Sequence, residues 1–216
     1  MHSRTLFILN LLPLIHKASS LRRVVSVLAA TYEGAIDVDN IAARGFPLYK
    51  HRNQISAVQS LLLQELGRRA PSVSFVHTLP GLVKGGIMRE MEMEVSFGVS
   101  IMIGISRLLT PLLETPPDEC GERHLFFATS SRYAPGNGTA AAAGVALGSD
   151  VTAAVGSDGE MASGVYSIDN KGESAPLKVV KLLSQYKNDG TAAKVQEYIG
   201  ADFNKILGRD AMLLGK

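Results

Sequence analysis

The sequence predicts an α/β fold in which helices cover a parallel sheet. Two short apolar segments, RRVVSVLAA at residues 22–30 and SVSFVHT at 72–78, are rich in β-branched residues, as expected of strands buried on both faces. A long segment with helical periodicity, residues 53–71, separates them. Strands that alternate with helices usually pair in parallel, and the crossover between these two is expected to be right-handed.

The first twenty residues, MHSRTLFILNLLPLIHKASS, have one arginine before an apolar run and small residues after it. This pattern has two interpretations, a secretory signal or an amphipathic helix of the mature fold over residues 3–16. We favour the helix, because the chain passes from this segment into the strand at 22–30 without a linker. A chain without a secretory signal is expected in the cytoplasm.

A loop and a helix are predicted after the first strand. Residues 31–50 are rich in Gly, Asp and Asn, and loops of this length inside a domain are usually functional or mobile. The helix over 53–71 is expected to begin at the cap residue Asn53 and to end near Gly67 and Pro71. Its apolar residues recur at helical spacing: Ile55, Val58, Leu62 and Leu66.

The second half of the chain is predicted to contain further helices and one more strand. We expect an apolar helix at 91–113, a helix at 117–131, a strand at 164–173, and two helices within 175–208 that are broken at Asn188-Asp189-Gly190. Residues 135–164 are low in sequence complexity, which favours an inserted surface segment. The chain is therefore predicted to comprise an α/β domain at 1–175, with the insertion at 135–164, and a helical extension at 176–216.

Composition and charge exclude several classes of protein. Hydrophobic residues make up 46% of the chain and charged residues 19%, so the chain can bury a core. Its net charge is +2 and its Lys and Arg residues are scattered, which argues against a nucleic-acid partner. The apolar run at 95–106 is shorter than the roughly 20 residues that a transmembrane helix needs. One cysteine, Cys120, and five dispersed histidines predict neither an intramolecular disulfide nor a metal site.

The second apolar strand ends in an unusual turn. The sequence continues from SVSFVHT into LPGLVKGG, so that Pro80 and Gly81 follow the strand directly. In open α/β sheets, ligands bind at the carboxyl ends of the strands. Glycine lets the main chain approach a ligand closely, and proline fixes the loop. The turn is interpreted either as a ligand-binding loop or as an ordinary connection from strand to loop.

The order of these segments resembles the second half of a short-chain dehydrogenase/reductase. The resemblance rests on RRVVSVLAA followed by SVSFVHTLPGLVKGG, within residues 1 to 133. The segments SRTLFILNLLPLI, GERHLFFATSSRYAP and GVYSIDNKGES are most similar to divergent fungal members found with secondary-metabolite gene clusters. The resemblance implies a partial Rossmann-like three-layer fold with a parallel sheet, from which the N-terminal βαβ cofactor unit is missing.

The same resemblance implies a function. Such an enzyme would be an oxidoreductase that uses NADP or NAD to interconvert a ketone and an alcohol on an apolar natural product, such as a polyketide or terpenoid. The loop formed by Pro80, Gly81 and Val83 would lie beside the nicotinamide. The apolar helix at 91–113 would cover the substrate.

The sequence departs from the family at its catalytic positions. Ala29 occupies the position of the catalytic serine, and the region around His51 lacks the Tyr-x-x-x-Lys motif of the family. Tyr49 and Lys50 are adjacent, so on a helix their side chains would point about 100° apart. Thr31, Tyr49 and His51 are the remaining candidates for catalysis, Thr31 as a substitute hydroxyl and His51 as a proton donor.

These departures leave alternatives open. The chain could be a catalytically inactive, truncated remnant, or a partner protein that associates through an exposed sheet edge or through the helix at 91–113. A homo-oligomer is expected in that case. A start codon further upstream would instead restore the glycine-rich fingerprint, and cleavage of a signal would predict a mature protein lacking about the first twenty residues.

Overall fold

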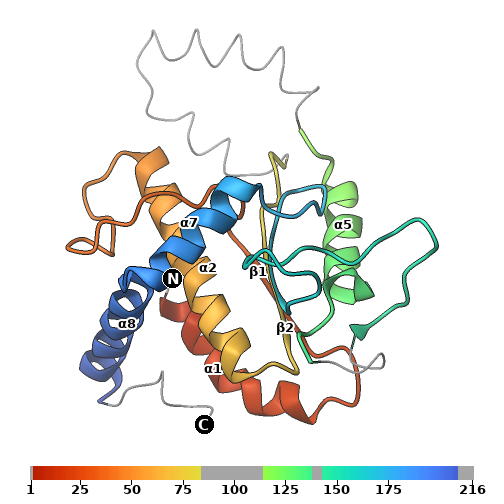
Figure 1. Ribbon diagram of the computed structural model, residues 1–216, viewed down its shortest axis with the longest axis horizontal. Helices are drawn as coiled ribbons and strands as arrows, with labels where there is room; N and C mark the ends of the chain where they lie inside the picture. Colours follow the sequence, from red (N-terminus) through yellow and green to blue (C-terminus); the bar gives the residue numbers. More distant parts are fainter. Residues whose placement is uncertain (1, 84–113, 138–142, 209–216) are drawn as a thin grey trace, which may run out of the picture.

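The computed structural model describes residues 2–83, 114–137 and 143–208, which form three layers with a parallel sheet in the middle (Figure 1). The described elements are α1 (His2–Lys17), β1 (Arg23–Val27), α2 (Leu48–Arg69), β2 (Ser74–Thr78), α5 (Pro117–Thr129), η2 (Ser131–Tyr133), β3 (Val165–Ile168), α7 (Leu177–Asn188) and α8 (Thr191–Leu207). The predicted α/β class and the parallel sheet are confirmed.

The three-stranded sheet has the order β1-β2-β3, and both pairings are parallel. Its register aligns Val24 with Phe75 and Phe75 with Val165. Side chains alternate between the two faces of a strand. Each face of the sheet therefore supplies its own core, and the carboxyl ends of the three strands meet at one edge.

The helix α2 covers one face of the sheet, with α1 beside it and α7 and α8 packed against it (Figure 1). Phe75 and Val165 of the sheet are buried in this core together with Leu9 of α1, Leu62 of α2 and Ile199 of α8. The predicted N-terminal helix is confirmed, and its Ile8, Leu9 and Leu12 are buried in the same core.

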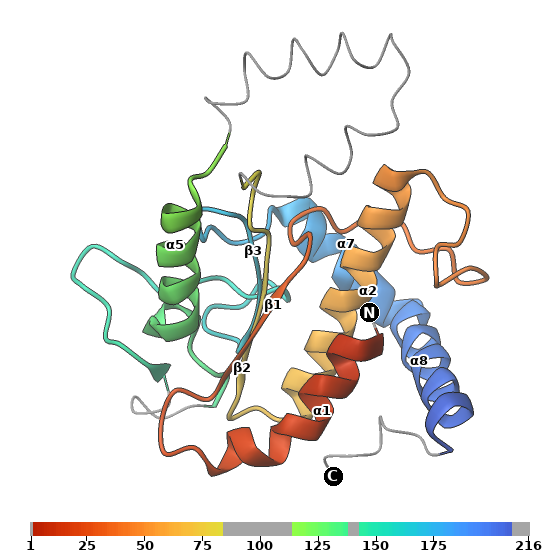
Figure 2. The ribbon, with the colours of Figure 1, turned by 180° about the vertical axis from the view of Figure 1, so that it is seen from behind.

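The opposite face carries α5, η2 and the segment that follows them (Figure 2). Its core is smaller and mainly aromatic. The ring of Tyr133 lies edge-on to the rings of Phe127 and Tyr166, at centroid separations of 6.0 and 5.5 Å. Aromatic pairs prefer this arrangement. Ala154, from the low-complexity segment, is buried against these rings.

Arg23 at the start of β1 ties the sheet to this second layer. Its two terminal nitrogens donate to four main-chain carbonyls, at 3.1 Å to Phe127, 2.7 Å to Ser130, 2.6 Å to Tyr133 and 2.9 Å to Ala143. Burial lowers the pKa of Arg23 to about 10. Hydrogen bonds from a charged group are the strong ones, so this side chain fixes the end of α5 on the sheet.

Two predictions about β1 are wrong. The strand ends at Val27 rather than at residue 30, because the chain turns away after the hydrogen bond from Leu28 N to Thr78 O. It is an edge strand, in which Val27 is 38% exposed and Ser26 is buried. A β-branched run looks the same in sequence whether one or two strands flank it.

The prediction for α2 is right in type and wrong at both ends. The helix begins at Leu48, after Pro47, so Asn53 lies inside it and is not its cap. It continues through Gly67 to Arg69. Gly67 does not end the helix but lets it approach β3, since a Cβ at this position would lie 2.3 Å from Val165 Cγ2.

The remaining boundaries differ from the predictions by a few residues. Helix α5 ends at Thr129, β3 covers only Val165–Ile168, and α7 and α8 meet at Gly190, whose φ of 82° ends the first helix as predicted. The predicted helix at 91–113 and the apolar run at 95–106 lie outside the described residues. Within the described residues, no helix has the length and apolar character needed to cross a membrane.

Replacing Gly67 by Ala is predicted to lower the free energy of unfolding by about 1–2 kcal/mol, because overpacking against Val165 exceeds the gain in helix propensity. Gly121 in α5 is the matched control, since a Cβ there meets nothing within 4 Å. Gly121→Ala should raise the free energy of unfolding by about 0.8 kcal/mol. Urea unfolding measures the free energy of unfolding of both variants. Equal effects of the two substitutions would contradict the packing role of Gly67.

Candidate functional site

The end of the sheet where the strands have their carboxyl ends, the carboxyl edge, holds Thr31 of the predicted site. Thr31 follows β1 and has a φ of 71°, a left-handed conformation that is unfavourable for a β-branched residue. Its N–H donates to Ser167 Oγ of β3 at 3.1 Å. The segment after β1 therefore crosses the end of β2 and reaches β3, and the main-chain donor of Thr31 is already occupied.

The loop after β2 contains the predicted cofactor residues Pro80, Gly81 and Val83. Gly81 has a φ of 80°, and a Cβ at this position would lie 2.8 Å from Asn170 Nδ2. Val83 pairs with Thr115 in an isolated bridge. The glycine is thus required by its backbone conformation and by the neighbouring Asn170, independently of any ligand.

Tyr49 and His51 lie on the first turns of α2, away from the loop residues. Tyr49 is 60% exposed, and His51 Nδ1 lies 3.2 Å from Ala43 O. Beside them is a hollow of about 380 Å³, lined in part by Asp37 and Lys50. No hydrogen bond or ion pair of the described residues joins Tyr49 or His51 to Thr31 or to the loop after β2.

A buried polar cluster below this edge was not predicted. Its centre is Glu33, whose Oε1 accepts hydrogen bonds from Ser60 Oγ of α2 at 2.7 Å and from Ser167 Oγ of β3 at 2.6 Å. His77 of β2 brings its Nδ1 within 2.8 Å of Ser60 Oγ and 3.6 Å of Glu33 Oε1. His77 is only 1% exposed, so the cluster is closed to solvent.

The protonation of the cluster follows from its geometry. Ser60 has one hydroxyl proton and donates it to Glu33, so the hydrogen bond between Ser60 and His77 requires the proton on His77 Nδ1. Burial alone would raise the pKa of Glu33. Three partners lower it: His77, through a hydrogen bond and its charge, and Ser167 and Ser60, through hydrogen bonds. Together they outweigh burial. The pKa of Glu33 is therefore held below its ordinary value, and the carboxylate is ionised inside the fold.

This cluster cannot act as a catalytic triad. In a triad, the nucleophile and the carboxylate contact different nitrogens of the histidine. Here Ser60 and Glu33 both lie at Nδ1 of His77, while His77 Nε2 and Glu33 Oε2 are buried without a hydrogen-bond partner among the described residues. The arrangement can hold the loop after β1 in place but cannot reach a substrate.

Polar side chains of α2 hold the rest of this loop. Ser56 Oγ donates to Ala29 O at 2.5 Å, and Gln54 accepts from Asp37 N at 2.9 Å while donating to Asn40 O at 2.6 Å. These bonds pair main-chain groups of the loop with side chains of the helix, and the carbonyl of Ala29 is a buried one. The signal was present in the sequence, because Ser56, Ser60 and Gln64 recur every four residues on one face of the helix.

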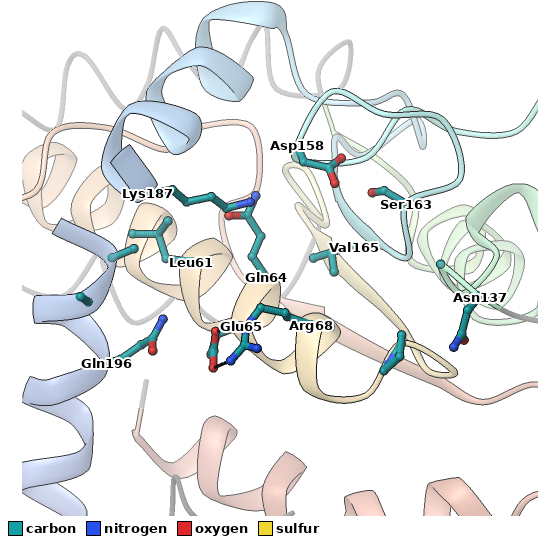
Figure 3. Close-up of a pocket in the computed structure, with 15 residues that line it drawn as sticks. Leu61, Gln64, Glu65, Arg68, Asn137, Asp158, Ser163, Val165, Lys187 and Gln196 are labelled. Carbon is teal, nitrogen blue, oxygen red and sulfur yellow. Dashed lines mark hydrogen bonds and ion pairs between the residues drawn. The ribbon is translucent and has the colours of Figure 1, made fainter. Parts of the chain in front are cut away.

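A cleft of about 630 Å³ lies at the other end of the sheet (Figure 3). Polar side chains in its wall include Gln64, Asp158 and Lys187, together with Glu65 of α2, whose carboxylate is 2.7 Å from Arg68 Nη2. It lies beside Val165, the first residue of β3. Its position at the amino end of the strand is not where doubly wound sheets bind dinucleotides.

The known proteins that this chain is similar to are named oxidoreductases or a short-chain dehydrogenase/reductase. The chain is 34% identical over 190 residues to an oxidoreductase of Emericella nidulans, an alignment that covers 86% of this chain and 54% of the relative. It is 27% identical to an oxidoreductase of Emericella variicolor, with 96% and 60% coverage, and 24% identical to a short-chain dehydrogenase/reductase of Stachybotrys chartarum, with 98% and 59% coverage.

The chain thus spans between half and three fifths of the length of these relatives. No protein-family model matches it, and no solved structure matches it significantly. The expected similarity to fungal oxidoreductases and to a short-chain dehydrogenase/reductase is confirmed at this level. Among the described residues, no group of three or more His, Cys, Asp or Glu side chains could hold a metal ion.

Replacing Glu33 by Gln is predicted to lower the free energy of unfolding at pH 7 by about 3 kcal/mol, because the charged acceptor of two buried hydroxyls is lost. Since the folded-state pKa is lowered, the stabilisation by the carboxylate is present above its unfolded pKa and disappears as the pH falls through the folded value. The difference between the two proteins should therefore narrow in acid.

Urea unfolding between pH 7 and pH 3 measures this difference. The exposed Glu122 on α5 is the control, and Glu122→Gln should leave stability within about 0.5 kcal/mol of the parent. A difference between parent and Glu33→Gln that is independent of pH would contradict a buried, ionised Glu33.

Proposed function

We propose that this chain forms part of an oxidoreductase that interconverts a ketone and an alcohol on an apolar natural product of fungal secondary metabolism, such as a polyketide or a terpenoid. The observation that carries the proposal is the similarity over 190 residues to a protein named oxidoreductase. The parallel sheet, with the predicted loop at the carboxyl end of its central strand, supports it. In the resemblance, the chain corresponds to the second half of the enzyme.

A nicotinamide cofactor, NADP or NAD, is part of the proposal, but the described residues do not form a complete site for it. Asn170 fills the space over Gly81, and Ser167 takes the main-chain donor of Thr31. The loop of Pro80, Gly81 and Val83 offers main-chain contacts to one end of a dinucleotide at most.

Thr31 is the catalytic candidate that the geometry favours over Tyr49 and His51. It lies at the carboxyl edge of the sheet, and its strained conformation, with a φ of 71°, is held by the hydrogen bond to Ser167. Residues held in such conformations cluster at functional sites. Tyr49 at the start of α2 is exposed, and His51 Nδ1 lies 3.2 Å from Ala43 O.

The alternative function is a catalytically inactive relative that acts through association, either as a homo-oligomer or with a partner protein. The observation that favours it is the open edge of β1, where Val27 and the neighbouring Phe7 are 38% and 69% exposed. An unpaired strand edge is a template for another strand. This alternative needs no cofactor.

Titration of the protein with NADPH and with NADH, followed by nicotinamide fluorescence, tests the proposal. We expect saturable binding of one of the two. Gly81→Ala should weaken it by about tenfold or more, because a Cβ at a φ of 80° must displace the loop from Asn170. Gly45→Ala is the matched control, since Gly45 has a φ of 72° but a Cβ there meets nothing within 4 Å.

The two substitutions share the backbone penalty, and only the Cβ at position 81 also meets a neighbouring side chain, that of Asn170. Binding that both weaken equally would reflect general destabilisation rather than a cofactor loop. The absence of binding up to about millimolar cofactor, where the binding free energy would be only about −4 kcal/mol, would contradict the oxidoreductase proposal and favour the inactive relative.

A further inference from the structure

The cleft at the amino end of β3 is walled by three parts of the chain that lie far apart in the sequence (Figure 3). Leu61 and Gln64 come from α2, and Lys187 comes from the last turn of α7. Asp158 and Ser163 belong to the segment that leads into β3. The volume of about 630 Å³ is typical of a small-molecule site. The cleft lies at the opposite end of the sheet from the proposed cofactor loop, so it is a separate site.

One corner of the cleft gathers oxygen atoms. The Gln64 amide donates to Ser157 Oγ at 2.9 Å and to Ser157 O at 3.2 Å, so it lies beside the residue that precedes Asp158. Ser163 Oγ and Asp158 Oδ1 both lie close to Gly156, at 1.9 and 2.8 Å from the point that a Cβ of this glycine would occupy. An amide, a hydroxyl and a carboxylate oxygen thus meet at one short segment of the chain.

Two of these oxygens are not used by the fold. Gln64 is only 9% exposed, yet its Oε1 has no hydrogen-bond partner among the described residues. Within the same part of the chain, Ser163 Oγ is also buried and unpaired. Asp158 Oδ1 accepts from Glu160 N at 3.1 Å, one of about four hydrogen bonds that a carboxylate can accept. Buried polar atoms are usually paired, so a donor bound in the cleft would supply the partners that the fold does not.

A primary ammonium group matches this set of oxygens. It has three N–H donors and no acceptor, and the corner offers one amide, one hydroxyl and one carboxylate oxygen. The charge of Asp158 compensates that of the ammonium, and hydrogen bonds between charged groups are the strong ones. A calcium ion would need about six or more oxygen ligands, which is more than this corner gathers. The chemistry of the corner therefore favours an amine.

The remaining charges of the cleft select among amines. Glu65 is already paired, because its carboxylate accepts from Arg68 and Arg69 at 2.6 to 3.0 Å. Lys187 has no hydrogen bond or ion pair with any described residue, and its side chain extends from α7 toward Gln64 (Figure 3). Lys187 would repel a ligand that carries only an ammonium group. A ligand that also carries a carboxylate would be attracted at both ends.

Apolar side chains form the wall between the charged groups. Leu61 of α2, Val165 of β3 and the alanines Ala192 and Ala193 of α8 line the cleft. Apolar surface of this kind gains free energy when it contacts an apolar group of a ligand. The ligand is therefore expected to carry an aliphatic or aromatic side chain in addition to its two charges.

We propose that this cleft binds a free α-amino acid with an apolar side chain. The ammonium group donates to Gln64 Oε1, Ser163 Oγ and the carboxylate of Asp158. The carboxylate of the ligand lies at Lys187, and its side chain contacts Leu61. Small rotations of Gln64 and Ser163 seat the ligand, since their oxygens are covered in the free protein. The site does not depend on the proposed oxidoreductase activity.

Isothermal titration calorimetry of the full chain with L-leucine and with L-phenylalanine tests the proposal. We expect saturable binding of at least one of them. Two analogues, 3-methylbutylamine and 4-methylpentanoate, keep the side chain of leucine and only one of its two charges. Each should bind at least about tenfold more weakly than leucine, because one charged contact is lost.

Substitutions in the wall separate binding from folding. Ser163→Ala removes an oxygen that has no hydrogen bond within the described fold, so it should leave the thermal unfolding midpoint unchanged while weakening binding about tenfold. Asp158→Asn keeps an oxygen for Glu160 N but loses the charge, and Lys187→Gln loses the opposite charge. Each should also weaken binding about tenfold. Glu160→Gln and Lys181→Gln are the matched controls at exposed positions, and their affinity should equal that of the parent.

Thermal unfolding shows whether each variant is folded, and Ser163→Ala decides the question if a charge variant is not. Three results would overturn the proposal. The first is no saturable binding of either amino acid up to about 10 mM. The second is equal affinity for leucine and 3-methylbutylamine, which would assign the cleft to simple amines. The third is unchanged affinity in folded Ser163→Ala, which would place the bound amino acid elsewhere on the protein.

Discussion

The buried carboxylate of Glu33 is the constraint on which the arrangement of the sheet, α2 and the long loop depends. It receives hydroxyl bonds from α2 and β3 and lies against His77 of β2. An ionised group without partners at this depth would cost several kcal/mol, so the loop after β1 must place Glu33 between these elements. The path of the chain from β1 to α2 is therefore fixed at Glu33, in addition to the hydrogen bonds from Ser56 and Gln54 that hold the rest of the loop.

The contact between the sheet and α2 changes from apolar to polar along the strands. Near the amino ends, Val24, Phe75 and Val165 face α2 in register, and the contact is apolar. Two residues further, the same face presents Ser26, His77 and Ser167 side by side, opposite the polar stripe of α2. A polar layer of this kind must be satisfied to be stable, and it uses most of its hydrogen-bonding groups to support the carboxyl edge from within.

The sequence was sufficient to predict the fold class, the three parallel strands and the helices that pack on them, because each is specified by local periodicity. It was insufficient for Glu33, since no local pattern relates a loop carboxylate to a serine 134 residues away. His77 looked like one residue of an apolar strand, although the serines of α2 facing it were visible as a stripe. The start of α2 at Leu48 was missed because Pro47 provides no side-chain cap of the kind that the sequence signal requires.

The four carbonyl bonds of Arg23 also have a consequence for the order in which the chain can fold during synthesis. Their acceptors lie 104 to 120 residues further along the chain, and the partner of Glu33 on β3 is further still. At typical ribosomal rates these partners emerge about ten seconds after β1. During that interval Arg23 lacks its acceptors and Glu33 has only Ser60 and His77 as partners, so the sheet is completed only after β3 has emerged.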